Sequence, residues 1–327
     1  MAEEQIMVSV LCTAYNHEPY IRDCLDGFVN QKTDFKYEVI IHDDASTDKT
    51  ADIIREYEAK YPDIIKPIYQ TQNQYSQGVR IGKVFFHPRI KGKYMAWCEG
   101  DDYWTDPKKL QKQVDFLESH PDFSLCCHRF KRYYENTDTW GDDYVTEPFT
   151  KHPNEEGLVV TNIENFRTRF TWTLTLCYRK AVADEIVWHP YILGRRDFTF
   201  HYHLLKAGKG YCFADYMGVY RINSGGVWQR MSSFDKVRFR LNGYDDFYSY
   251  HKDDEDVLIC YLEWLDRFYH DYAFSVFARH KITRNGVKSV FFAAKHYWKL
   301  KGPIYAVKKC CQCAIAFVAP KKCEKWK

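Results

Sequence analysis

Residues 94–104 read Tyr-Met-Ala-Trp-Cys-Glu-Gly-Asp-Asp-Tyr-Trp, so an apolar run is followed directly by three carboxylates, Glu99, Asp101 and Asp102. Carboxylates this close repel one another. A hard divalent cation such as Mg²⁺ or Mn²⁺ neutralises them and completes its shell with water and substrate phosphates. The stretch therefore indicates a metal site that holds a phosphorylated ligand. The alternative is an acidic loop that turns the chain and caps the next helix, and the stretch by itself does not separate the two.

The segments before this stretch alternate between strand-like and helical patterns. Apolar runs predict strands at residues 6–13, 37–42, 64–69 and 94–98, and helical spacing predicts helices around residues 20–28 and 54–57. This alternation is typical of a parallel sheet with right-handed crossovers, so we predict an α/β fold. The acidic stretch then lies at the carboxyl edge of the sheet, where open α/β sheets bind their ligands.

The region after the acidic stretch continues the same scheme. Asp106 and Pro107 predict the N-cap and the first residue of a further helix. Residues 171–178 alternate in polarity and predict a strand. From residue 233 onward the chain is aromatic and helical in character, without strand-like alternation. We therefore predict two domains, a sheet domain over residues 1–230 and a helical C-terminal extension over residues 231–327.

The composition is that of a globular protein, with 327 residues of which 45% are hydrophobic and 28% charged. A formal net charge of only +3 argues against nucleic acid as a partner. The acidic start of the chain, Met1-Ala-Glu-Glu-Gln5, lacks the pattern of a secretory signal. We therefore expect a cytoplasmic protein whose 12 cysteines are reduced.

The end of the chain is basic. The apolar run at residues 310–319 is too short to span a bilayer, which takes about 20 residues, and lysines flank it on both sides. Such a segment could lie peripherally on an anionic surface, at the inner face of the cytoplasmic membrane. The alternative is a terminal helix that packs on the domain and leaves a solvated basic end. The pattern leaves both interpretations open.

Three loops are expected to meet at the carboxyl edge of the sheet: Thr13-Ala-Tyr-Asn16, Asp43-Asp44 and residues 99–102. In combination these motifs make residues 6–230 similar to the family 2 glycosyltransferases of the GT-A fold, in particular the bacterial branch that builds polysaccharides. The resemblance implies a Rossmann-like, mostly parallel sheet. It also implies transfer of a sugar from a nucleotide-sugar donor.

The resemblance implies that Thr13, Tyr15, Asp43 and Asp44 hold the base and ribose of the donor, usually uridine. A tyrosine can cover the face of a base. An aspartate that accepts the imide N–H of uracil would distinguish uracil from cytosine. For Asp43 and Asp44 the alternative role is to cap the next helix.

The D-x-D metal motif of the family falls on Glu99-Gly100-Asp101, where Glu99 departs from the commoner aspartate. The resemblance implies that Asp101 binds Mn²⁺ or Mg²⁺, that Glu99 lies near the ribose or a metal-bound water, and that Asp102 supports them. Gly100 would let the backbone approach the diphosphate closely. The cation would offset the charge that develops on the leaving nucleoside diphosphate.

Further positions extend the resemblance. It implies that Asp197, at the start of a helix, takes the proton of the acceptor hydroxyl, with a helix N-cap as the alternative. Asn223 stands where the family often has a histidine, so a third metal ligand there would be weaker. Arg221 could pair with the diphosphate or form a surface ion pair. Trp172 and Trp228 are candidate sugar platforms or core residues.

We therefore predict an inverting, metal-dependent glycosyltransferase. It would move a sugar, from UDP in the first instance, to a hydroxyl of a glycan or lipid-linked acceptor in capsule, exopolysaccharide or lipopolysaccharide assembly. Two alternatives remain. One is a sugar nucleotidyltransferase, although residues 13–17 lack its Gly-rich, basic phosphate loop. The other is a non-catalytic member that binds glycan or partner enzymes.

Overall fold

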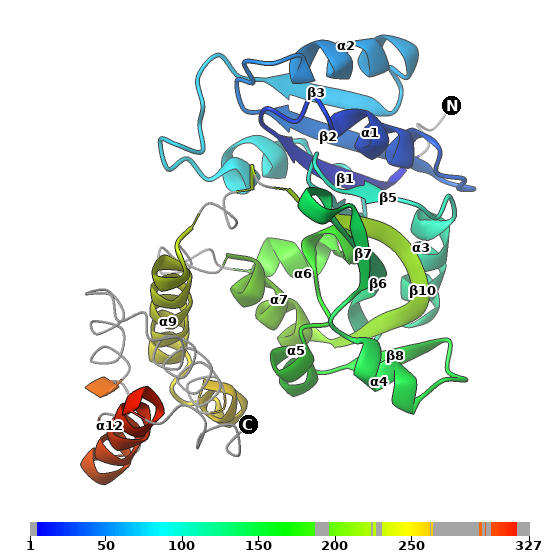
Figure 1. Ribbon diagram of the computed structural model, residues 1–327. Coiled ribbons are helices and arrows are strands. Elements are labelled where there is room, and N and C mark those ends of the chain that lie inside the picture. Colours follow the sequence, from blue (N-terminus) through cyan, green and yellow to red (C-terminus); the bar gives the residue numbers. More distant parts are fainter. Residues whose placement is uncertain are drawn as a thin grey trace. The chain divides into compact units, whose positions relative to one another are not determined.

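The computed structural model describes residues 5–186, 196–223, 225–226, 231–261, 263, 294–295, 298 and 302–318 (Figure 1). The chain divides into two compact units, Met1–Val187 with Phe200–Ser224, and Trp188–Thr199 with Gly225–Lys327. The second unit contains helices α9 (Ser233–Tyr250) and α12 (Pro303–Val318). The division of the chain at residue 230 stays a prediction. None of the helices in the described ranges is long and apolar enough to cross a membrane.

In the described part of the first unit, the strands form one sheet in the order β3-β2-β1-β4-β9-β6-β10-β5, with β7 beside β6 and β8 beside β10 (Figure 1). The strands are β1 Ile6–Ala14, β2 Lys36–Asp43, β3 Ile65–Tyr69, β4 Tyr94–Trp97, β5 Tyr103–Trp104, β6 Phe123–Tyr134, β7 Thr139–Asp142, β8 Gly157–Val160, β9 Cys177–Arg179 and β10 Lys209–Ile222. β1 pairs in parallel with β2 and β4, β2 with β3, and β6 with β10. The predicted α/β fold with a mostly parallel sheet is confirmed.

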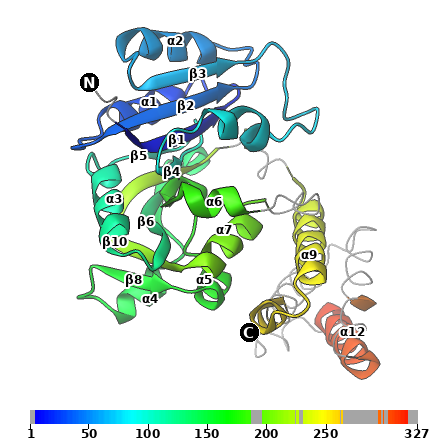
Figure 2. The ribbon, with the colours of Figure 1, turned by 180° about the vertical axis from the view of Figure 1, so that it is seen from behind.

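Helices cover both faces of the sheet, which explains the buried apolar stretches of the central strands, such as Val39–Ile41 of β2. The helices are α1 Ile21–Val29, α2 Thr50–Lys60, α3 Lys109–Ser119, α4 Thr146–Lys151, α5 Asn162–Thr168, α6 Lys180–Glu185 and α7 Arg196–Ala207, with short turns η1 Gly82–Phe86, η2 His87–Arg89, η3 Glu135–Thr137 and η4 Thr173–Thr175. Leu25 of α1 and Val114 of α3 share one buried cluster with Val10 of β1. Leu204 of α7 shares a second cluster with Leu11 of β1. In both views α3 and α7 lie on opposite sides of β6 (Figure 1, Figure 2).

Helix α3 begins later than the sequence predicts. Asp106 and Pro107 are the predicted cap and first residue, but α3 begins at Lys109. The Asp106 Oδ1 atom accepts the N–H of Lys108 at 2.8 Å, and the carbonyl of Pro107 accepts the N–H of Lys32 at 2.7 Å. These two hydrogen bonds hold residues 106–108 as a turn. The Asp106 carboxylate therefore accepts a hydrogen bond from the turn that precedes α3 and not from the helix itself.

The strand predicted at residues 171–178 is only partly formed, because η4 interrupts it and only β9 pairs with neighbouring strands. Side chains from other elements take the carbonyls that a strand partner would otherwise use. Trp104 Nε1 donates to the carbonyl of Leu174 at 2.9 Å, and Gln113 Nε2 donates to the carbonyl of Thr175 at 2.9 Å. The alternating pattern is real, but the tertiary contacts favour a turn over a strand.

The long strands β6 and β10 are absent from the sequence prediction. They pair in parallel from Lys209 opposite Phe123 to Ile222 opposite Tyr134, with register shifts on β10 between Phe213 and Gly218. Such irregularities bend a strand and interrupt the two-residue alternation from which strands are predicted. The consequence is functional, because the end of β10 contacts the acidic stretch after β4.

Candidate functional site

The loops that follow β1, β2 and β4 meet at one edge of the sheet. Ala14 and Asp43 are paired at the ends of β1 and β2. The N–H of Gly100 donates to the carbonyl of Thr13 at 2.9 Å, which ties the third loop to the first. The structure therefore brings together the three loops in which the sequence predicts a nucleotide and a metal.

The acidic group Glu99, Asp101 and Asp102 lies in the loop between β4 and β5. One carboxylate oxygen from each residue lies within 4.8 Å of the others. Asp102 is buried, and the pKa of its carboxyl is raised well above its usual range, first by burial and then by the charges of Asp101 and Glu99. Converging carboxylate oxygens are the donors that Mg²⁺ and Mn²⁺ prefer. The residues present therefore fit the cation that the resemblance implies.

The end of β10 supports this acidic group from one side. The backbone N–H of Arg221 donates to Asp102 Oδ1 at 2.8 Å, and Asn223 Nδ2 donates to Asp101 Oδ2 at 3.1 Å. Asn223 therefore lies beside the predicted metal ligand and presents a donor to it. An amide nitrogen does not bind a cation, so in this contact Asn223 holds the carboxylate. Its predicted role as a metal ligand stays a prediction.

The Arg221 side chain is almost fully buried, with 9% of its surface exposed. Its Nη1 donates to the carbonyl of Asp101 at 3.2 Å, and its Nη2 forms an ion pair with Asp23 of α1. The guanidinium also lies over the ring of Tyr103, 4.5 Å from its centroid. The sequence leaves two roles open for Arg221, pairing with the diphosphate or forming an ion pair with another residue. The structure contains the ion pair.

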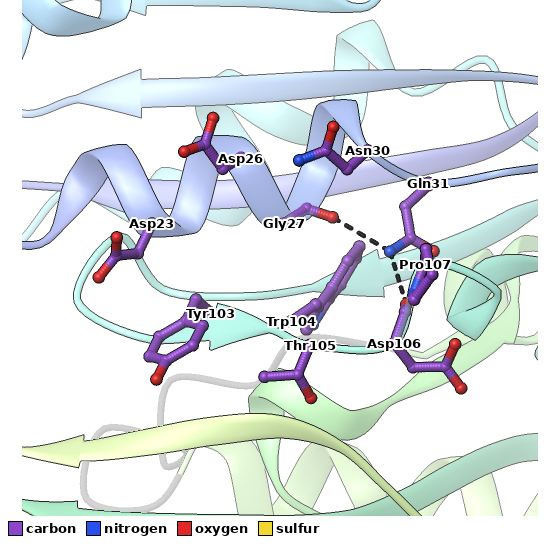
Figure 3. A pocket seen from close by; sticks show the side chains of 10 residues that line it. All are labelled: Asp23, Asp26, Gly27, Asn30, Gln31, Tyr103, Trp104, Thr105, Asp106 and Pro107. Carbon is purple, nitrogen blue, oxygen red and sulfur yellow. Dashed lines mark hydrogen bonds between the residues drawn. The ribbon is translucent and has the colours of Figure 1, made fainter.

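A pocket of about 400 Å³ lies next to the contacts of Arg221, between α1 and the segment that contains β5 (Figure 3). Its lining includes Asp23 and Tyr103, both of which contact Arg221. Within it, Gln31 Nε2 donates to the carbonyls of Gly27 at 3.1 Å and Asp106 at 2.9 Å (Figure 3). None of the residues predicted to bind nucleotide or metal lines this pocket.

Asp43 and Asp44 are both buried and both hold loops. Asp43 Oδ1 accepts the hydroxyl of Ser46 at 2.5 Å. The two oxygens of Asp44 accept the N–H groups of Gln74 at 2.7 Å and Tyr75 at 3.0 Å. Within the part of the chain that the structure describes, neither carboxylate accepts a hydrogen bond from the first turn of α2, so these contacts do not support helix capping. A carboxylate oxygen that accepts one N–H retains capacity for another, so a role toward a base stays a prediction.

The loop after β1 presents Tyr15 and is held by its neighbour Asn16. Tyr15 is 44% exposed, which leaves the ring accessible to a base. Asn16 Oδ1 accepts the N–H of Thr47 at 2.8 Å, and the N–H of Asn16 donates to the Ser46 hydroxyl at 3.0 Å. Asn16 has a left-handed backbone (φ 53°), which asparagine tolerates better than most residues. The sequence pattern alone gives Asn16 no separate role.

Gly100 is required by close packing. A Cβ atom there would lie 2.8 Å from His17 Nδ1 and 3.2 Å from the carbonyl of Thr13. The Nδ1 atom of His17 is buried and has no hydrogen-bond partner in the described part of the chain. Burial lowers the pKa of His17, although Asp101 opposes the shift, so the ring is neutral at pH 7. A lone histidine carries no sequence signal, which is why this neighbour of the acidic group was missed.

Three further residues are predicted to take part: Asp197, Trp172 and Trp228. Asp197 is exposed in the first turn of α7 and belongs to the second unit, so its role as the base stays a prediction. Trp172 stacks on Tyr144 with centroids 5.0 Å apart, and the guanidinium of Arg169 lies 3.8 Å from its ring centroid. Trp172 therefore already has an aromatic and a cationic neighbour. Trp228 lies outside the described residues.

Comparison with known sequences identifies the family. Residues 9–182 match the model of glycosyl transferase family 2. An uncharacterized protein of Mycobacterium bovis is 35% identical over 221 residues, which make up 68% of this chain and 60% of that protein. The chain thus spans about three fifths of the length of that relative. The putative teichuronic acid biosynthesis glycosyltransferase TuaG of Bacillus subtilis is 28% identical over 228 residues, covering 68% of this chain and 83% of TuaG.

Comparison with solved structures identifies the fold. The structure of S. aureus TarS residues 1–349 in complex with UDP-GlcNAc superposes with a TM-score of 0.66 at 18% identity, covering 92% of this chain and 89% of that one. The mannosyltransferase PcManGT from Pyrobaculum calidifontis, in complex with GDP-Man and Mn²⁺, gives a TM-score of 0.51 at 13% identity, covering 98% and 89%. The fold is that of the GT-A enzymes. The chain belongs to glycosyl transferase family 2.

Proposed function

We propose that this protein is a metal-dependent, inverting glycosyltransferase that moves a sugar from a UDP-sugar to a hydroxyl of a glycan or a lipid-linked acceptor, in the synthesis of a cell-surface polysaccharide. The observation that carries the proposal is the group Glu99, Asp101 and Asp102, whose oxygens converge within 4.8 Å at the edge where β1 and β2 also end. Membership of family 2 supports the reaction type. Similarity to TuaG, a putative teichuronic acid biosynthesis glycosyltransferase, supports the acceptor class, and similarity to TarS in complex with UDP-GlcNAc supports the uridine donor.

Each predicted residue has its own role in this proposal. Tyr15 covers the base, and Thr13 with the Asp43-Asp44 pair holds the nucleoside. Asp101 would hold Mn²⁺ or Mg²⁺, with Glu99 near the ribose or a metal-bound water, and the cation when bound would supply positive charge beside the leaving diphosphate. Asp102 supports Asp101 through the buried turn that both occupy.

Asp197 acts on the other substrate in this proposal. Its carboxylate accepts the proton of the acceptor hydroxyl, so that the oxygen can attack the anomeric carbon. Direct attack from the face opposite the diphosphate inverts the anomeric configuration. The proton ends on Asp197, and the nucleoside diphosphate leaves with the electron pair of the broken bond.

The test is a binding and hydrolysis panel of UDP-, GDP-, dTDP- and CMP-sugars, each measured with Mn²⁺ and with EDTA. We expect binding and slow hydrolysis of one UDP-sugar, lost when EDTA removes the cation. Selective use of a GDP-sugar would overturn the uridine assignment alone. A folded protein that binds no donor would overturn the enzyme assignment and favour a non-catalytic member of the family.

We further propose that the protein is cytoplasmic and contacts the inner face of the membrane through its C-terminal segment. Ile304 and Val307, one helical turn apart on α12, are 86% and 55% exposed, and lysines follow them. Vesicle sedimentation tests this. We expect binding to vesicles that contain phosphatidylglycerol, weak binding to phosphatidylcholine alone, and loss of binding when residues 303–327 are deleted. Equal sedimentation of the full and shortened chains would exclude the proposal.

A further inference from the structure

Arg221 is placed to act on the acidic turn rather than on a ligand. The backbone N–H and the side chain of this one residue contact Asp102 Oδ1 and the Asp101 carbonyl, at 2.8 and 3.2 Å. Its Nη2 is engaged by Asp23, 198 residues earlier in the chain, on α1. With the side chain only 9% exposed, little of the guanidinium surface remains for a diphosphate.

We propose that Arg221 is a positioning residue, anchored by Asp23, which holds the Asp101-Asp102 turn in the geometry that binds the divalent cation and does not itself bind the diphosphate. This inference rests on the proposed function, because it concerns the same metal site. Nothing in the family membership assigns a role to Asp23, which lies on the exposed side of α1.

The physical need for such an anchor comes from the carboxylates themselves. Glu99, Asp101 and Asp102 repel one another, and without a cation the repulsion favours a wider turn. Arg221 opposes this through a hydrogen bond to each of the last two residues, and Asn223 adds a third contact at Asp101. A turn held in place before the cation arrives binds it more tightly, since less ordering remains to be done on binding.

Two elements of the fold hold Arg221 in place. It lies at the end of β10, which pairs with β5 through Val219 opposite Tyr103. The ring of Tyr103 then lies under the guanidinium, 4.5 Å from it. On one side Arg221 contacts Tyr103 of β5, the strand that follows the acidic turn. On the other side it contacts Asp23 of α1. Two separate elements are thereby fastened to the metal-binding loop.

The experiment measures Mn²⁺ binding by the loss of the free-ion EPR signal, and UDP binding by calorimetry with Mn²⁺ and with EDTA. The variants are Asp23→Asn, Arg221→Met and Arg221→Lys. Glu56→Gln is the matched control, because it removes the exposed ion pair of Arg22 and Glu56, also on the α1 side, 2.7 Å apart. Asp23→Asn changes an exposed helix position, so it tests the proposal even if Arg221→Met folds poorly.

We expect Asp23→Asn and Arg221→Met to weaken Mn²⁺ binding by about 10-fold or more, the usual effect of losing a residue that orients metal ligands. UDP binding in EDTA should be unchanged in both, Arg221→Lys should restore part of the Mn²⁺ affinity, and Glu56→Gln should match the wild type.

Two outcomes would overturn the inference. If Arg221→Met weakens UDP binding equally with Mn²⁺ and with EDTA, and Asp23→Asn does not, Arg221 is a diphosphate ligand. If the wild type binds Mn²⁺ and Asp23→Asn binds it equally well, the anchor has no role while the proposed function stands. A wild type that binds neither Mn²⁺ nor UDP overturns the proposed function, and this inference with it.

Discussion

Asp101→Asn should lower kcat/KM for sugar transfer by about 100- to 1,000-fold, the loss that follows removal of one group stabilising the charge of the transition state. The amide has nearly the same shape as the carboxylate but lacks its charge, and it is a weaker ligand for a hard cation. Donor binding in the presence of Mn²⁺ should weaken as well, whereas binding in EDTA should not change. Steady-state kinetics and calorimetry on the same preparation measure both effects.

The control for Asp101→Asn is Asp122→Asn. Asp122 is an exposed carboxylate of the same unit, paired with Lys209 at 3.1 Å and outside the acidic group. Both changes remove one negative charge, so a difference in kcat/KM between the two variants comes from the position of the charge that is lost. An Asp101→Asn protein that keeps more than a tenth of the wild-type activity would show that Asp101 does not hold an essential cation.

Asp197→Asn should lower kcat by about 100- to 10,000-fold, the usual contribution of a general base. Binding of the UDP-sugar should be unchanged, because Asp197 acts on the acceptor. The substitution also separates the base from the cap, since asparagine and aspartate cap helix N-termini about equally well. A residue that only caps would therefore tolerate asparagine with little change in kcat or melting temperature.

The product of the same assay gives a second result for Asp197. Inversion of the anomeric configuration, read from the proton NMR coupling of the transferred sugar, is expected from direct attack on the donor. Retention of configuration would contradict the base assignment regardless of the kinetics of Asp197→Asn. Unchanged kcat with inversion would place the base on another residue.

Much of the fold and part of the site follow from local sequence. Parallel strands that are buried on both faces are mostly apolar, so β1, β2 and β4 stand out from their surroundings. Once strands and helices alternate, the strand ends lie on one edge, and Asp43 and Asp101 are brought to it. No knowledge of contacts is needed for that conclusion. For this reason the acidic stretch by itself already indicates a metal site at that edge.

Other features depend on contacts between distant residues. The sequence leaves Arg221 with two possible roles, and only the ion pair with Asp23 favours one. For Asp44 the sequence favours a role toward the base and leaves helix capping as the alternative, whereas in the structure its carboxylate accepts the N–H groups of Gln74 and Tyr75. When a side chain can form several hydrogen bonds, its actual partner is the one that the fold brings within about 3 Å. The local sequence pattern contains no information on that distance.

The amino-acid sequence by itself determined the α/β class, the edge of the sheet that carries the site, and the residue types that suit a divalent cation, because each of these follows from periodicity and the chemistry of side chains. Only the tertiary structure decided that β10 returns beside β6 and brings Arg221 and Asn223 to Asp101 and Asp102. The reason is that this pairing joins residues far apart in the chain, from Phe123 with Lys209 to Tyr134 with Ile222, and its stability comes from burial and long-range hydrogen bonds rather than from local preference.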